Sequence, residues 1–245
     1  MDYSRYSFSR RELVQNISIF LALDAALSYL FYDSVLPFLL ALILLKPFLK
    51  FQKQEYCRKR RAKLAMQFLD GMQAVSSALT AGYSVETAFR DACAELEKIY
   101  TEKDMIMMEF RYISAQLGIN RSLEELLNSL AERSGVEDIR NFAEIFAVSK
   151  RSGGNLIAII RNTVQAISQK EETHREIETA LASKKMEQGI MSLVPMLILF
   201  YIQLVSPGFL DVMYHNALGV TVMTISLAVY AGAYYWGRKI VEIQV

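Results

Sequence analysis

Residues 64–79 read LAMQFLDGMQAVSSAL, and this stretch decides the fold class. Its large apolar residues recur at intervals of three and four positions, at Leu64, Phe68, Met72, Val75 and Leu79. That spacing places them along one face of an α-helix, as a stripe that packs against other helices. Between residues 64 and 181 there is no proline and no stretch of strict alternation. We therefore predict an all-α fold.

Short turns divide residues 64–181 into about six helices. The breaks fall at residues 81–83, near 100–101, and at 118–120, 134–135 and 153–154. Ser84 is placed to cap a helix that begins at Val85, and Ser122 with Glu125 has the Ser-x-x-Glu spacing of a capping box. A segment of about 115 residues is large enough to bury a core of its own, so we expect a compact helical bundle.

Two apolar segments lie on each side of this middle region, at residues 13–32, 35–49, 190–205 and 217–236. Segments of about 20 residues span the ~30 Å hydrocarbon core of a bilayer, and snorkelling of Lys46 would lengthen the shorter second segment. A cleaved secretory signal is disfavoured, because Asp24 interrupts the first segment and a second apolar segment follows almost at once. We predict an integral membrane protein in which two pairs of transmembrane helices flank the bundle.

The lysines and arginines predict the orientation in the membrane. They gather before the first apolar segment, after the second, before the third and after the fourth, whereas the connections at 33–34 and 206–216 contain none. Because basic residues stay on the cytoplasmic side, we expect both termini and the bundle in the cytoplasm. The alternative is a single bent span over residues 13–49, which would place Arg5, Arg10 and Arg11 outside.

These predictions divide the chain into six parts. They are a cytoplasmic N-terminal segment (1–12), a transmembrane hairpin (13–49), a basic juxtamembrane segment (50–63), the cytoplasmic helical domain (64–188), a second transmembrane hairpin (189–236) and a cytoplasmic tail (237–245).

The net charge of +1 is a cancellation between unlike regions. Residues 1–63 contain 11 Lys and Arg against 5 Asp and Glu, whereas residues 64–180 contain 12 against 18. An acidic bundle would repel phosphates, so we expect no nucleic-acid partner. The acidic charge suits docking against a basic protein surface, although solvated helix faces explain it equally well.

No set of residues has the spacing of a catalytic or cofactor site. Two cysteines, Cys57 and Cys93, and two distant histidines, His174 and His215, do not make a metal centre. The chain has no phosphate loop of the Gly-x-x-x-x-Gly-Lys-Ser/Thr type, so it does not bind ATP in that way. We interpret the glycine pair at 153–154 as a tight turn between helices rather than as an anion site. We expect no enzymatic activity, no metal and no cofactor.

Two further features are candidates for contacts with partners. Asp24 lies in the middle of a predicted span, where an ionised carboxylate is costly. It either contacts the membrane helix of a partner or lies inside the protein's own helix bundle. The basic run Arg58, Lys59, Arg60 and Arg61 fixes the topology and is placed to bind anionic lipid headgroups or an acidic partner.

The order of several motifs resembles the type II secretion system F domain. The resemblance covers about residues 62–200, and the spacing of the motifs between membrane segments makes it specific. The matching residues are Gly82, Ser84, Ala88, Gly118, Ser122, Leu123, Glu125, Arg133, Gly153, Gly154, Asn155 and Leu156. The chain has one copy of the domain, as in the TadB/TadC class of tight-adherence (Flp) pili, whereas platform proteins of classical type II systems carry two.

The resemblance implies a platform protein in the inner membrane of a bacterial or archaeal cell, which couples a cytoplasmic secretion ATPase to the extraction of pilins from the membrane. The implied partners are that ATPase, pilin subunits, membrane lipids, and a paralogous platform protein or a second copy of the chain. The alternative is a small membrane transporter or channel subunit with a cytoplasmic helical domain. Such a protein would line several spans with polar residues, and only Asp24, Gln203 and a few hydroxyl side chains qualify.

Overall fold

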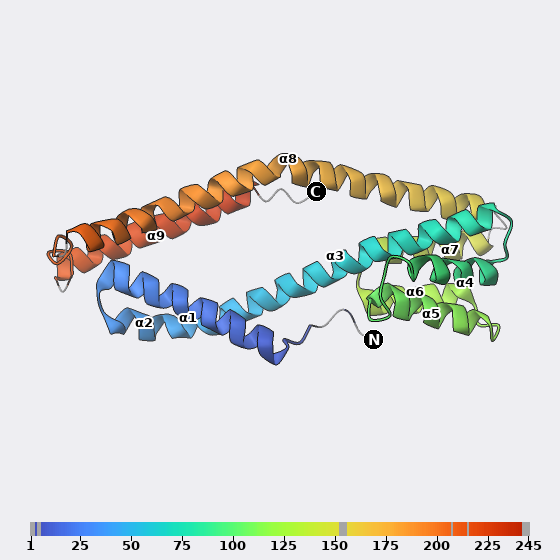
Figure 1. Cartoon of the computed structure of the whole chain (residues 1–245), viewed down its shortest axis with the longest axis horizontal. Helices are drawn as coiled ribbons and strands as arrows, with labels where there is room; N and C mark the ends of the chain where they lie inside the picture. Colours follow the sequence, from blue (N-terminus) through green and yellow to red (C-terminus); the bar gives the residue numbers. More distant parts are fainter. Residues whose placement is uncertain (1–2, 4–5, 152–155, 207, 215, 242–245) are drawn as a thin grey trace. The chain divides into compact units, whose positions relative to one another are not determined.

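The computed structural model describes residues 3, 6–151, 156–206, 208–214 and 216–241. Within these residues every regular element is a helix and there is no β-strand, which confirms the all-α prediction. The chain divides into two compact units (Figure 1). The first unit takes its residues from 1–7 and 52–172, and the second from 8–51 and 173–245.

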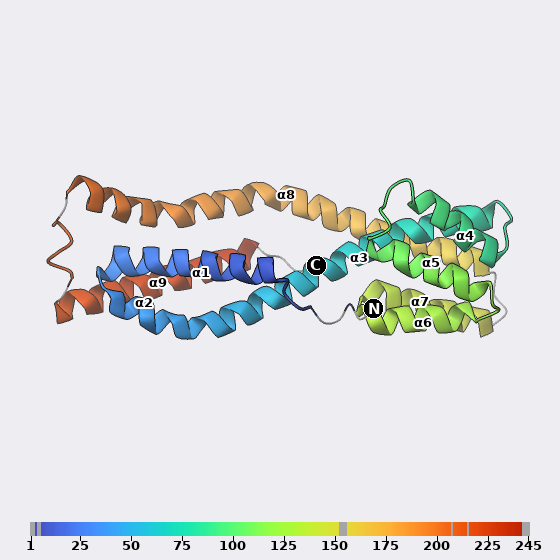
Figure 2. The same ribbon diagram turned by 60° about the horizontal axis from the view of Figure 1, so that its bottom comes forward.

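In the described part of the chain, six helical segments form the first unit. Two long helices each contribute one end, α3 (Leu45–Thr80) and α8 (Leu156–Val205). The four shorter helices are α4 (Val85–Leu96), α5 (Met105–Leu117), α6 (Leu123–Ser134) and α7 (Glu137–Arg151). Successive helices of this unit run in opposite directions, so their turns alternate between the two ends of the bundle (Figure 2).

The apolar stripe predicted from residues 64–79 lies in the core of the first unit. Each of its five members is at most 3% exposed, namely Leu64, Phe68, Met72, Val75 and Leu79. The Phe68 ring meets the edge of the Phe142 ring on α7, with their centroids 5.6 Å apart. A Cβ atom at Gly71 would overlap the Phe110 ring, so this glycine lets α5 approach α3 closely.

The helix ends coincide with the predicted turns. Gly82 (φ 92°) and Gly135 (φ 61°) adopt the left-handed conformation, which costs glycine nothing sterically. In the turn at 118–120 it is Asn120 (φ 61°), and not Gly118, that takes this conformation. The predicted break at 153–154 lies outside the described residues.

One of the two predicted helix caps is present. The Ser84 hydroxyl accepts a hydrogen bond from the Thr87 backbone N–H at 3.3 Å, as expected for a cap of α4. The capping box predicted at Ser122 is wrong, because its side chain makes no bond to the first turn of α6. Its hydroxyl instead accepts a hydrogen bond from the Lys150 ammonium of α7, at 3.2 Å.

The second unit contains the four candidate membrane spans. Its own helices are α1 (Arg10–Tyr32), α2 (Val35–Ala41) with a 3-10 turn (Leu42–Leu44), and α9 (Ala217–Val241), and it shares α3 and α8 with the first unit. Four stretches are long and apolar enough to cross a membrane, at Arg10–Tyr32, Val35–Thr80, Ile157–Val205 and Ala217–Ile240. Many of their large apolar side chains are exposed, as expected for contact with lipid rather than water.

Residues 13–49 form a helical hairpin rather than one bent helix. Asp33 (φ 43°) ends α1 in the left-handed conformation, and the Ser34 hydroxyl accepts a hydrogen bond from the Leu36 N–H at 3.4 Å. Phe20 and Phe48, on opposite arms of the hairpin, have ring centroids 5.1 Å apart. The basic stretch at 50–63 is helical throughout, since α3 runs from Leu45 to Thr80 without a break.

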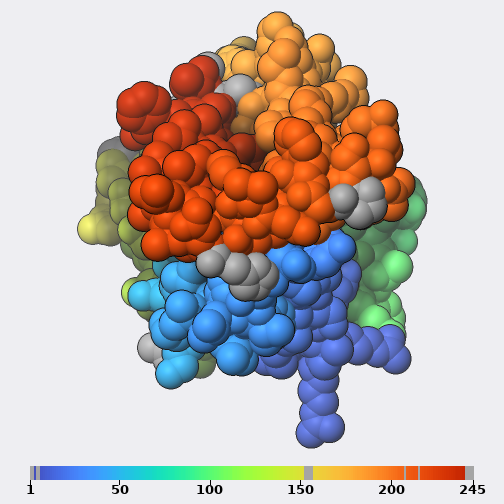
Figure 3. Space-filling model, turned by 90° about the vertical axis from the view of Figure 1, so that its left-hand side faces the viewer, coloured from blue at the N-terminus to red at the C-terminus, as the bar shows by residue number. Residues whose placement is uncertain are grey.

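The N-terminal hairpin packs against the C-terminal hairpin of α8 and α9 within the second unit. Figure 3 shows the two hairpins side by side, in blue and in orange to red. The Tyr214 hydroxyl donates a hydrogen bond to the Leu30 carbonyl at 2.7 Å. The Tyr32 and Thr224 hydroxyls lie 3.0 Å apart. These contacts join the ends of the hairpins that carry the short connections.

Candidate functional site

The glycine and serine motif residues lie in turns at one end of the first unit. Gly82 and Ser84 belong to the turn before α4, and Gly118 and Ser122 to the turn before α6. Both turns lie at the same end of the bundle, together with the C-terminal end of α7 (Figure 1). We call residues 81–84, 118–122 and 148–151 the motif end. Gly153, Gly154 and Asn155 lie outside the described residues, and Leu156 begins α8.

The motif end presents apolar side chains to solvent among charged ones. Ile119 is 67% exposed and Val148 is 65% exposed. Around them, the Arg151 guanidinium pairs with the Glu124 carboxylate at 3.3 Å, and Lys150 contacts Ser122. Exposed apolar side chains rimmed by charges are typical of protein–protein contact surfaces. The arrangement is suited to binding a partner.

The remaining motif residues do not belong to one site. Ala88 and Leu123 are buried in the core of the first unit, where they pack the helices together. Glu125 is exposed on the first turn of α6, where its charge complements the helix dipole. Arg133 ends α6 at the opposite end of the bundle from the motif end. The family motif therefore marks turns, core positions and one ionic contact.

Arg133 belongs to a buried polar cluster with Glu109 of α5 and Tyr3 of the N-terminal segment. Its guanidinium donates to both oxygens of the Glu109 carboxylate, at 2.7 Å each. The Tyr3 hydroxyl donates to the same carboxylate at 2.8 Å, and the Tyr3 backbone N–H donates to the Arg133 carbonyl at 2.8 Å.

Burial and the bond to Glu109 hold the pKa of Tyr3 well above its ordinary value. The bond to Glu109 also raises the pKa of Arg133. We call these three residues the Tyr3 cluster.

Part of the predicted basic run packs against this same end of the first unit. The Arg60 guanidinium lies over the Tyr3 ring, 5.1 Å from its centroid. Arg61 approaches Gly135 so closely that a Cβ atom there would lie 3.1 Å from its guanidinium. Lys59 is exposed, and Arg58 pairs with Glu55 at 3.2 Å on the solvent side. Arg60 and Arg61 thus contact the protein itself, which leaves Arg58 and Lys59 as the more accessible charges.

Two members of the Tyr3 cluster were not identified from the sequence. The helical periodicity of α5 could have identified Glu109, because Glu109 shares an apolar face with Ile106, Phe110 and Ile113. In the structure Glu109 is only 4% exposed. An acidic residue on a buried stripe needs a charged partner. Tyr3 had no such signal, since it precedes the first helix and the partners of its hydroxyl and its backbone N–H, Glu109 and Arg133, are more than 100 positions away.

Asp24 lies on the buried face of α1 in the second unit. It is 7% exposed, and the nearby Asn16 and Ser28 on the same helix are buried as well. Among the described residues, its Oδ2 atom has no hydrogen-bond partner. This burial supports the interpretation that Asp24 faces the interior of its own helical unit.

The described residues contain no group of three or more His, Cys, Asp or Glu side chains placed to hold a metal ion. Their architecture is that of a multi-pass helical membrane protein that carries a compact helical bundle between its apolar segments.

The family is shown by the match of a family model. The model for type II secretion system (T2SS), protein F, matches residues 72–204, more than half of the chain, and the chain belongs to this family. No curated protein and no solved structure matches the chain significantly. Members of the family are non-catalytic platform proteins of the inner membrane in type II secretion and type IV pilus systems, where they work with secretion ATPases and pilins. The predicted family is therefore confirmed.

Proposed function

We propose that this chain is the platform of a tight-adherence (Tad/Flp-like) pilus or a related type II secretion assembly. In this role it couples a cytoplasmic secretion ATPase to the extraction of pilins from the inner membrane. The observation that carries the proposal is the motif end, where the family's turn residues lie at the same end of the bundle as the exposed side chains of Ile119 and Val148.

The energy for extraction has to come from a second protein. Pulling an apolar pilin helix out of lipid requires work, and this chain has no phosphate loop with which to bind ATP. α3 and α8 each continue from the first unit into an apolar stretch long enough to span the membrane. A force applied to the bundle by an ATPase would be passed along these two helices to the spans, which bind the pilins and a paralogous platform protein or a second copy.

The Tyr3 cluster supports the proposed topology, with the bundle and both termini in the cytoplasm. Tyr3 lies before α1 and yet bonds to Glu109 and Arg133 within the bundle. These bonds favour a topology in which the residue before the first span and the bundle after the second lie on the same side of the membrane, with an even number of crossings between them. Two spans in residues 13–49 meet that requirement, and the basic residues place this side in the cytoplasm.

Photo-crosslinking in living cells tests the proposed docking of the ATPase. A photoreactive amino acid is placed at Ile119 or Val148, and the attached protein is identified by mass spectrometry. We expect both positions to capture a secretion ATPase. Ile99 is the matched control, because it is 70% exposed but lies in the connection between α4 and α5, at the other end of the bundle. Equal capture of the ATPase at Ile99 would overturn the proposal. Capture of a solute-binding protein at Ile119 and Val148 would also overturn it, and would favour a transporter subunit.

A further inference from the structure

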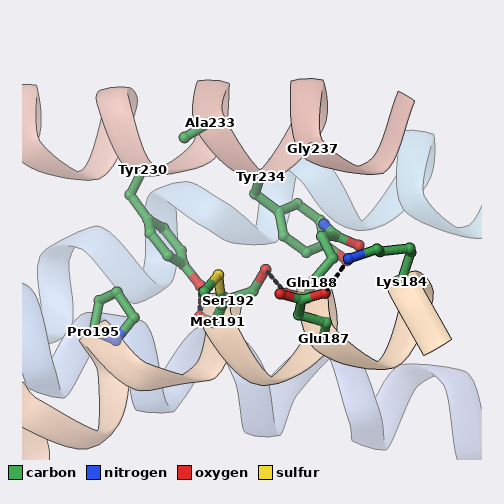
Figure 4. Close-up of a pocket in the computed structure, with 10 residues that line it drawn as sticks. All are labelled: Lys184, Glu187, Gln188, Met191, Ser192, Pro195, Tyr230, Ala233, Tyr234 and Gly237. Atoms are coloured by element: carbon green, nitrogen blue, oxygen red, sulfur yellow. Dashed lines mark hydrogen bonds and ion pairs between the residues drawn. The ribbon is translucent and has the colours of Figure 1, made fainter. Parts of the chain in front are cut away.

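A groove of about 420 Å3 opens between α8 and α9 in the second unit (Figure 4). Lys184 and Glu187 line one end of the groove, and Met191 and Pro195 line the other. Tyr230 and Tyr234 project from α9 toward α8 across it. The lining therefore changes from charged to apolar along the length of α8.

The groove is held open by specific contacts. The Tyr230 hydroxyl donates a hydrogen bond to the Ser192 carbonyl at 2.6 Å, which fixes the tyrosine ring across the two helices. A Cβ atom at Gly237 would lie 3.3 Å from Nε2 of Gln188, so the absence of a side chain at Gly237 leaves room for the Gln188 amide. Among the described residues, this buried Nε2 atom has no hydrogen-bond partner. The Gln188 amide thus belongs to the packed wall of the groove, beside Gly237.

The groove lies where the proposed spans meet the cytoplasmic surface of the membrane. The apolar segments at 190–205 and 217–236 have their cytoplasmic ends near Gln188 and Tyr234. Tyr234 and its neighbour Trp236 are exposed aromatic side chains of the kind that lie at headgroup depth. The charged end of the groove is therefore at the level of lipid headgroups, and its apolar end is at the level of the acyl chains.

We propose that this groove binds one phospholipid with an ethanolamine headgroup. The Lys184 ammonium and the Glu187 carboxylate lie 2.9 Å apart, and both side chains are more than half exposed. Together they complement a zwitterionic headgroup, with Lys184 beside the phosphate and Glu187 beside the ammonium. One acyl chain lies along Met191 and Tyr230.

The same charges disfavour the other common headgroups. A phosphatidylglycerol headgroup brings no cation for Glu187, whose carboxylate would face a second negative charge. A choline headgroup has no N–H to donate to that carboxylate. The proposal concerns a lipid site of the second unit and does not depend on the partner that binds the motif end.

Retention of defined lipids by the full-length protein tests this site. The protein is reconstituted with equal amounts of phosphatidylethanolamine and phosphatidylglycerol of identical acyl chains, and the lipids it retains are measured by native mass spectrometry. We expect preferential retention of phosphatidylethanolamine, which falls about fivefold in Lys184→Ala and in Glu187→Gln. Lys185→Ala is the charge-matched control, because Lys185 is exposed on α8 but does not line the groove. Equal retention of the two lipids, or equal losses in Lys184→Ala and Lys185→Ala, would overturn the proposal.

A second pair of variants tests the groove itself rather than its charges. Gly237→Leu fills the space beside Gln188, whereas Gly232→Leu on the same helix places the same side chain where no atom lies within 4 Å of an added Cβ. We expect Gly237→Leu to lose the retained phosphatidylethanolamine and Gly232→Leu to keep it, with equal helix content by circular dichroism. Full retention by Gly237→Leu would show that the lipid binds elsewhere and would reject the site.

Discussion

Arg133 and Glu109 form a two-point ion pair between α6 and α5, with both N···O distances at 2.7 Å and with Glu109 only 4% exposed. Removing one partner of a buried pair leaves an uncompensated charge, which costs about 3–5 kcal/mol. Replacing both partners with apolar side chains of similar volume is often close to neutral. Single and double substitutions of this pair therefore test how much it contributes to the stability of the first unit.

We expect Arg133→Met to lower the free energy of unfolding of the first unit by about 3–5 kcal/mol. Glu109→Leu combined with Arg133→Met should restore most of this loss, but not all, because the Tyr3 hydroxyl then lacks its acceptor. The readout is the rate of thiol modification at Cys93 in a Cys57→Ser background. Cys93 is buried in this unit, and burial raises the pKa of its thiol, so it reacts when the unit opens.

Arg111→Met is the matched control for this prediction. Arg111 pairs with Glu97 and Glu102 at 2.8 and 3.1 Å, but these side chains are well exposed. Exposed pairs contribute little to stability, so Cys93 should stay protected in this variant. Similar labelling rates in Arg111→Met and Arg133→Met would contradict a structural role for the buried pair.

The second prediction concerns the attachment of the N-terminal segment through Tyr3. Tyr3→Ala removes a fully buried ring and should release the segment, whereas Tyr3→Phe keeps the ring under Arg60 and should cost only about 1 kcal/mol for the lost hydrogen bond. The Cys57 sulfur lies 3.9 Å from the Tyr3 carbonyl oxygen, so release should raise the thiol labelling of Cys57 at least about tenfold in a Cys93→Ala background.

The same contact predicts a loss of stability in alkali. The folded protein holds the pKa of Tyr3 above its ordinary value of 10.0, so the neutral phenol stabilises the fold. This contribution is complete below pH 10 and is lost as the pH rises toward the higher pKa of the folded state. Protection of Cys57 should fall in this range in the wild type and not in Tyr3→Phe. Tyr83→Phe, at the exposed motif end, should behave as the wild type.

Local patterns in the sequence predicted the helices, and contacts distant in sequence account for what was missed. The stripe from Leu64 to Leu79 and the Ser84 cap depend on spacings within one or two turns, and both are present. The Ser122 cap has the same local pattern but is absent, and the Ser122 hydroxyl instead accepts a hydrogen bond from Lys150, 28 positions away. The competing contact belongs to the packing of α7 against α6, and no local rule contains it.

The Tyr3 cluster shows the same limit for the candidate sites. Arg133 was identified only as a motif position, and its partner Glu109 lies 24 positions earlier on another helix. The burial of Glu109 follows from the periodicity of α5, but its pairing follows from the way α5 and α6 lie together. Sequence periodicity predicts which faces are buried, whereas it does not specify which polar groups meet there.

The third prediction concerns acid, through Asp104 at the start of α5. Its carboxylate accepts hydrogen bonds from the Lys63 ammonium at 2.9 Å and from the Thr101 N–H at 3.0 Å, which together hold its pKa well below the ordinary 3.8. A carboxyl group with a lowered pKa stabilises the fold above about pH 4, and this contribution is lost as the pH falls below that value. The midpoint temperature of thermal unfolding should therefore fall on acidification from about pH 4 to about pH 2.5, and less steeply in Asp104→Asn. Asp91→Asn changes a carboxylate on the exposed face of α4, so its unfolding midpoint should fall with pH as steeply as that of the wild type.

The fourth prediction concerns the buried carboxyl group of Asp24. A buried polar atom without a partner costs about 1–3 kcal/mol, so we expect Asp24→Leu to insert normally and to raise the thermal midpoint of the second unit. Asn16→Leu is the control, because Asn16 is also buried but its amide donates a hydrogen bond to the Glu12 carbonyl at 2.8 Å. We expect no rise in the thermal midpoint of the second unit in that variant. Near-wild-type stability of Asp24→Leu with complete loss of pilus assembly would instead assign Asp24 to a contact with a partner's membrane helix.

The fifth prediction concerns topology and uses single cysteines in a chain without Cys57 and Cys93. A cysteine at Phe209, which is 68% exposed in the connection between α8 and α9, should react in intact cells with a reagent that does not cross the inner membrane. A cysteine at Glu125 on α6 should react only after the membrane is permeabilised, because the proposed topology, based on the basic residues next to the spans, has the bundle in the cytoplasm. Labelling at Glu125 in intact cells would place the bundle outside, where no ATP-driven motor could reach the motif end. That result would reject the topology and the proposed platform function together, whereas protection at Glu125 with labelling at Phe209 is the pattern that four spans and a cytoplasmic motor require.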